Sequence, residues 1–113
     1  MNSIESLGQL SIRPIVEQCR DVLAAHYGEQ LNSLVLYGSA ARQEMTEESD
    51  IDLLVVLEEP LDYFRELRMI VDLIYPLQMV SSHWISAGPA AVNEFESGAI
   101  QLYRNALEEG VTV

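Results

Sequence analysis

Two apolar runs separated by an acidic turn constrain this chain more than any other feature. The residues from Leu31 to Tyr37 and from Ile51 to Leu57 are each typical of a β-strand, and the second run is apolar almost throughout, so both of its faces must be covered. Ten residues separate Ser39, just after the first run, from Asp50, just before the second. A parallel pair would need a crossover of about a dozen residues or more, so antiparallel pairing is favoured. The end of the first strand and the start of the second then lie at the same edge of the sheet.

That edge gathers residues suited to binding phosphate and metal. Side chains alternate along a strand, so Asp50 and Asp52 point the same way with their Cα atoms about 7 Å apart. Two carboxylates at that spacing suit a divalent cation that also holds phosphates. Gly38 lets a ligand approach the backbone closely, and Ser39 can cap a short helix beginning at Ala40 and offer its N–H groups to an anion. The pattern predicts a phosphate cradle facing a metal-binding pair.

The rest of the chain predicts a single domain over residues 1–113. Residues 1–11 are expected to form a loose or partly helical arm, followed by a helix from Ile12 to about Gly28 with Ser11 as its N-cap. An amphipathic helix is expected over 61–75, ended by Pro76, followed by a third strand over 77–84. The last element is expected to be a helical region over 86–109 that is capped by Ser86 and closed by Gly110, with a break near Ser97 and Gly98. The helix over 61–75 is apolar on more than one face, which predicts an interface with a second copy or with a helical partner.

Charge and composition narrow the classes of partner. The chain has 18 acidic and 6 basic residues, all of the latter Arg, for a net charge of -12. Such a surface repels a phosphodiester backbone, so DNA and RNA are not expected to bind directly. A nucleotide held through a divalent cation is compatible with this acidic surface, because the metal supplies the positive charge. We expect a cytoplasmic protein that does not enter a membrane. The sequence has one cysteine, Cys19, no recognisable leader, and no apolar run close to the roughly 20 residues that a membrane helix needs.

The segment from Gly38 to Asp52, "GSAARQEMTEESDID", carries a resemblance to a known family. Gly-Ser, ten residues and then Asp-x-Asp is similar to the signature of the minimal nucleotidyltransferases, small members of the DNA polymerase beta superfamily. The arginine of the usual Gly-Ser-x-Ala-Arg-Gly opening is present as Arg42, and "SDIDLLV" and the closing "LYRNALEEGV" extend the resemblance.

The resemblance implies an α+β fold with a small mixed three-stranded sheet flanked by helices. It implies that Gly38, Ser39 and Arg42 bind the nucleotide, and that Asp50 and Asp52 are catalytic and bind Mg²⁺. The implied reaction transfers AMP from ATP to an acceptor. Stand-alone members of this length resemble antitoxins that adenylylate a tyrosine on a helical HEPN ribonuclease. From the residues alone, Arg42 is instead expected to pair with acids of its own loop, Glu44, Glu47 or Glu48.

Two departures from the family pattern leave alternatives open. Gln43 stands where the family has Gly after the arginine, and no acid lies between Asp72 and Glu94, where the family's third carboxylate is expected. Gln78 is the expected occupant of that third position, or Ser81, Ser82 or His83 in a shifted register. Because Gln cannot act as a general base, one hypothesis is an enzyme with two carboxylates and a base such as His83 or one from the partner. The other is a catalytically impaired module that neutralises its partner by binding alone.

Overall fold

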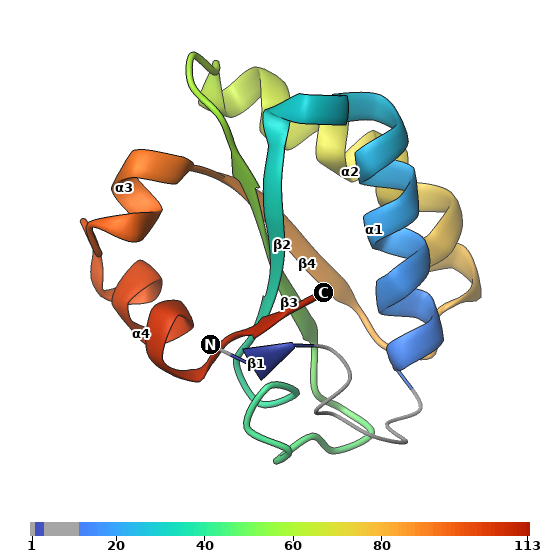
Figure 1. Ribbon diagram of the computed structural model, residues 1–113. Helices are drawn as coiled ribbons and strands as arrows, with labels where there is room; N and C mark the ends of the chain where they lie inside the picture. Colours follow the sequence, from blue (N-terminus) through green and yellow to red (C-terminus); the bar gives the residue numbers. More distant parts are fainter. Residues whose placement is uncertain (1, 4–11) are drawn as a thin grey trace.

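Figure 1 shows the computed structural model, which describes residues 2–3 and 12–113. The described residues form a five-stranded mixed sheet in the order β1, β5, β2, β3, β4. The strands are β1 (Asn2–Ser3), β2 (Leu31–Tyr37), β3 (Ile51–Leu57), β4 (Ile85–Ala91) and β5 (Val111–Thr112). The expected α+β class is confirmed, and the sheet has two short strands, β1 and β5, beyond the three that were expected.

The two strands predicted around the acidic turn pair as expected. β2 and β3 are antiparallel, with Tyr37 opposite Asp52 and a register shift between Leu31 and Ser33. β4 lies parallel to β3 on its other side, with Ser86 beside Asp52. The end of β2, the start of β3 and the start of β4 therefore meet at one edge of the sheet, at the bottom of Figure 1.

Helices cover both faces of the sheet. α1 (Arg13–Tyr27), continued by a 3₁₀ turn η2 (Gly28–Gln30), packs with α2 (Tyr63–Val80) on one face, and α3 (Val92–Glu96) and α4 (Gln101–Glu109) lie on the other (Figure 1). The first helix is confirmed within a residue at each end, with Ile12 at its N-cap position. The expected cap Ser11 lies outside the described residues, as does most of the expected arm over 1–11. The helices that the structure describes are too short or too polar to cross a bilayer.

Two apolar clusters explain why β3 is apolar at nearly every position. Leu53 and Val55 join the cluster under α1 and α2. Leu54 and Val56 join the cluster formed with α3 and α4. Successive side chains of a strand point to opposite faces, so Asp52 belongs to the face covered by α3 and α4.

The predicted third strand over 77–84 is wrong, because α2 does not end at Pro76. α2 runs through the proline to Val80, and β4 begins only at Ile85. Proline removes one backbone donor, here the N–H that would bond to the carbonyl of Asp72, and both residues are on the exposed side of α2 where water can satisfy that carbonyl. Ser86 therefore lies within a strand and caps no helix. The break at Ser97 and Gly98 and the helix end at Gly110 are confirmed.

Candidate active site

The turn that follows β2 places a glycine against a carboxylate. Gly38 has a φ of +74°, and a Cβ added to it would collide with the Asp52 carboxylate, whose Cγ would lie 3.4 Å away. Only glycine combines that backbone conformation with so close an approach. The central geometric prediction is confirmed: the Gly-Ser turn (Gly38 and Ser39) and the aspartates share one rim of the sheet.

The segment after Gly38 coils back on itself and is not the regular helix that was expected at Ala40. Its backbone bonds run from Arg42 N–H to Gly38 O at 3.2 Å and from Glu44 N–H to Ser39 O at 2.9 Å. Ala40 is fully buried in the cluster under α1 and α2, which anchors the turn to the core. The rim is thus held by backbone bonds and burial, with no helix N-terminus pointing at it in this described segment.

The two aspartates and Arg42 act on one another electrostatically. Burial raises the pKa of Asp52, the charge of Asp50 raises it further, and the charge of Arg42 opposes both. Asp52 is half-buried and Asp50 is exposed. A carboxylate whose ionisation is disfavoured by burial and by a neighbouring acid, as that of Asp52 is, is stabilised when a cation binds beside it. Mg²⁺ commonly binds through one or two carboxylates plus substrate phosphates, so this donor pair fits such an ion.

Arg42 lies at the same rim and is held by two acids. Its Nη1 donates to Glu109 Oε2 at 2.9 Å, and its Nε lies 3.5 Å from Glu44 Oε1. The hydrogen bond to Glu109 is the main reason that the pKa of the guanidinium is raised. The predicted pairing with a loop acid is confirmed for Glu44. The bond to Glu109, at the end of α4, was not predicted because 67 residues separate the two.

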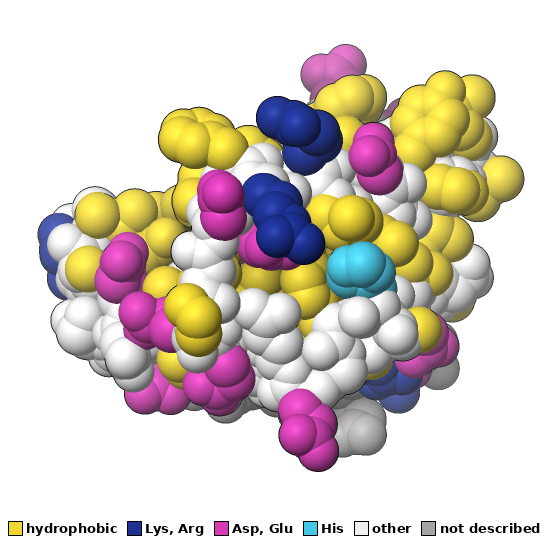
Figure 2. All heavy atoms as spheres, turned by 90° about the horizontal axis from the view of Figure 1, so that it is seen from above, with side chains coloured by type: hydrophobic (Ala, Val, Ile, Leu, Met, Phe, Trp, Pro, Cys, Tyr) yellow, Lys and Arg dark blue, Asp and Glu magenta, His cyan; other side chains and the backbone are white. Residues whose placement is uncertain are grey.

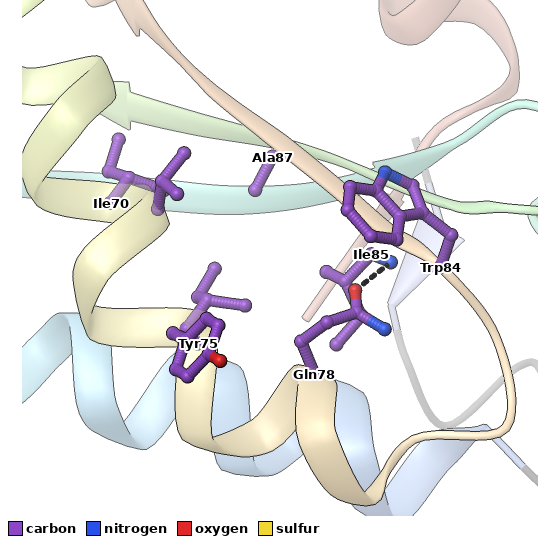
Figure 3. A pocket seen from close by; sticks show the side chains of 8 residues that line it. Ile70, Tyr75, Gln78, Trp84, Ile85 and Ala87 are labelled. Atoms are coloured by element: carbon purple, nitrogen blue, oxygen red, sulfur yellow. Dashed lines mark hydrogen bonds between the residues drawn. The ribbon is translucent and has the colours of Figure 1, made fainter.

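The structure places Gln78 elsewhere than expected. It lies in the last turn of α2, where its Nε2 donates to His83 O at 3.1 Å and its Oε1 accepts from Ile85 N at 2.6 Å (Figure 3). These bonds fix the turn that leads from α2 into β4. The expectation that Gln78 stands on the third strand is therefore wrong, and Ser86 is the residue of that strand beside Asp52.

The other candidates for the third position also serve the α2 to β4 turn. Ser81 Oγ donates to His83 O at 2.8 Å, and His83 Nδ1 lies 2.9 Å from Ser49 O. Because a carbonyl only accepts, His83 carries its proton on Nδ1 in this contact. His83 thus joins this turn to the residue that precedes Asp50. Within residues 2–3 and 12–113, no group of three or more His, Cys, Asp or Glu residues could bind a metal. A cation at this rim would therefore depend on the pair Asp50 and Asp52 together with the phosphates of a bound nucleotide.

Tyr37 and Ser86, neither of which was predicted from the sequence to belong to the site, flank Asp52. Tyr37 pairs with Asp52 from β2, and Ser86 pairs with it from β4. Burial raises the pKa of Tyr37, and the charge of Asp52 contributes in the same direction. Tyr37 could have been found from the antiparallel register, since it directly precedes Gly38. Ser86 could not be found without the correct bounds of α2.

Comparison with known proteins gives three consistent similarities. The family model described as "Nucleotidyltransferase domain" matches residues 16–105. A protein of Methanocaldococcus jannaschii named "Putative protein adenylyltransferase" is 31% identical over 96 residues, covering 84% of this chain and 90% of the relative. A second protein of that organism with the same description is 39% identical over 54 residues, covering 48% of this chain and 53% of the relative.

The fold has a counterpart among solved structures. The crystal structure of a protein from Sulfolobus solfataricus described as a "putative nucleotidyltransferase" superposes with a TM-score of 0.59 at 17% sequence identity, covering 88% of this chain and 78% of the other. At that identity the likeness concerns the fold alone.

Proposed function

The chain belongs to the nucleotidyltransferase domain family, and from this we propose that it is a protein adenylyltransferase that uses ATP and Mg²⁺. The names of the two archaeal relatives support a protein as the acceptor. The observation that carries the proposal is the close approach of Gly38 to the Asp52 carboxylate, which puts the family's two motifs on one rim.

The residues of the rim have separate roles in this reaction. Asp50 and Asp52 would hold Mg²⁺, which would offset part of the triphosphate charge and polarise the phosphorus–oxygen bonds. Ser39 and the backbone at Gly38 orient the phosphates, and Arg42 adds positive charge beside them. An acceptor hydroxyl oxygen forms a bond to the α-phosphorus and its proton passes to solvent. The bond from that phosphorus to the pyrophosphate oxygen breaks, pyrophosphate leaves, and AMP remains on the acceptor.

The partner that we propose is a helical HEPN-type toxin that docks on the outer side of α2. Four large apolar side chains of α2, at helical spacing, are exposed by 55–73%: Phe64, Val71, Tyr75 and Met79. Figure 2, seen from the end of the sheet opposite the candidate site, shows hydrophobic side chains gathered on the side of the molecule where α2 lies. A second copy of this chain is the competing occupant of that surface.

A second function is supported by Ser86. A serine beside Asp52 cannot take a proton as a carboxylate can, which favours a module that binds nucleotide and neutralises its partner without transfer.

The test is intact-mass analysis of a co-expressed HEPN-type protein after incubation with ATP and Mg²⁺. Wild type is compared with Asp50→Asn and with Asp21→Asn, which changes an exposed aspartate on α1. An AMP adduct with wild type and Asp21→Asn but not with Asp50→Asn supports the enzyme. Neutralisation of the toxin by all three proteins without an adduct supports the binding module. If the toxin is neither modified nor neutralised, the antitoxin assignment is wrong.

A further inference from the structure

Ser86 occupies the position on β4 that lies beside Asp52 on the same face of the sheet. The parallel register pairs the two residues directly, and neighbouring strands are about 4.8 Å apart. Side chains alternate along β4, so Ser86 shares a face with Ala90, and Ala90 packs with Leu54 and Val56 in the cluster under α3 and α4. Asp52 shares that face with Leu54 and Val56. Ser86 is exposed, so its hydroxyl is accessible from the rim.

The row of three residues across the strands carries a single carboxylate. Tyr37 lies on one side of Asp52 and Ser86 on the other, and both side chains are neutral hydroxyls. The second carboxylate, Asp50, directly precedes β3, the strand that carries Asp52. Glu44 and Glu109, the other acids at this rim, are paired with Arg42, so the described residues offer a cation the two carboxylates of Asp50 and Asp52 and no third.

A pair of divalent cations about 3.5 to 4 Å apart needs more negative charge than one cation does, because the two ions repel each other across that distance. A hydroxyl can donate an oxygen to a cation, but it brings no charge to offset the repulsion. We propose that this site holds one divalent cation with the nucleotide, and that Ser86 is the residue that excludes a second. The inference rests on the proposed nucleotide site and specifies how many ions serve it.

The spin-exchange signal of paired Mn²⁺ tests how many divalent cations the site holds, and it requires no catalytic turnover. Mn²⁺ replaces Mg²⁺, and the electron paramagnetic resonance spectrum is recorded with a non-hydrolysable ATP analogue. Wild type is expected to give the spectrum of isolated ions, whereas Ser86→Asp, which adds the third carboxylate beside Asp52, is expected to give an exchange-coupled pair. Asn93→Asp is the control, because it adds the same charge at an exposed position on α3 and should leave the ions isolated.

The outcomes separate this inference from the proposed function. An exchange-coupled pair in wild type, or isolated ions in a folded Ser86→Asp, overturns the inference, and the wild-type spectrum decides even if the variant does not fold. Isolated Mn²⁺ in wild type together with a coupled pair in Ser86→Asp supports it. Because the analogue is not hydrolysed, a failure to transfer AMP to any acceptor would remove the proposed activity and leave these spectra unchanged. A wild type that binds no Mn²⁺ with the analogue would remove both.

Discussion

Replacing Gly38 with alanine perturbs the backbone and the site at the same time. The φ of +74° is a left-handed conformation, and forcing a residue with a Cβ into it costs about 1 to 3 kcal/mol of folding free energy. The new Cβ also overlaps the Asp52 carboxylate. A carboxylate at the end of a short side chain can rotate away, so the overlap should displace the metal ligand and add little to the loss of stability.

Gly28→Ala is the matched control for this variant. Gly28 also has a positive φ, +55°, but a Cβ added there meets nothing within 4 Å. Both variants should therefore lose stability within the same range of about 1 to 3 kcal/mol. Only Gly38→Ala should lose metal–nucleotide affinity, by about 10- to 100-fold, the usual effect of disturbing the residues that orient a metal ligand.

Two measurements on each variant separate these effects. Urea denaturation gives the free energy of unfolding, and calorimetric titration with Mn²⁺ and a non-hydrolysable ATP analogue gives the affinity. If Gly38→Ala binds as tightly as Gly28→Ala, the contact between Gly38 and Asp52 has no part in ligand binding and the reasoning is refuted.

Three further predictions concern stability. Burial and the charge of Asp50 raise the pKa of Asp52, so protonated Asp52 stabilises the fold below its ordinary pKa of about 4, and this contribution is lost as pH rises through the folded-state pKa. Asn resembles the protonated form, so without cations Asp52→Asn should be more stable than wild type at neutral pH but not at about pH 3. Urea denaturation at the two pH values measures the difference. Tyr27→Phe removes a 3.0 Å hydrogen bond to Glu66 that joins α1 to α2, and should lower the free energy of unfolding by about 1 to 2 kcal/mol; an unchanged urea midpoint would contradict this. Gly110→Ala should lower the free energy of unfolding by about 1 to 3 kcal/mol, because the new Cβ collides with the backbone of α4. Gly88→Ala, whose new Cβ would have its nearest contact at 3.8 Å, should change the thermal midpoint little. Equal midpoints for the two variants would argue against the packing described.

The site could be predicted to the extent that it depends on one local segment. The two strands that flank the turn, their antiparallel pairing and the shared rim all follow from the short connection between Tyr37 and Ile51, and each is present. The coil after Gly38 differs from the expected helix in that Gln43 has a φ of +60°, a left-handed conformation that a right-handed helix cannot continue through.

The third strand could not be predicted because its signals depend on tertiary structure. The sequence of β4, "ISAGPAA", is poor in β-branched residues and contains glycine and proline, so local propensity disfavours a strand. Its pairing with β3 and its packing under α2 and α3 override that propensity. Pro76 predicts the end of a helix, yet α2 continues past it, because an exposed proline can stay inside a helix when water satisfies the carbonyl that it leaves unpaired. With α2 ended too early, Gln78 was assigned to a strand and Ser86 to a helix cap.

The most direct test of the account is the anomalous scattering of Mn²⁺ in crystals grown with a non-hydrolysable ATP analogue. A Mn²⁺ peak is expected within bonding distance of the carboxylate oxygens of Asp50 and Asp52, with the triphosphate against Gly38 and Ser39. A nucleotide bound with its metal at any other place on the molecule would contradict it.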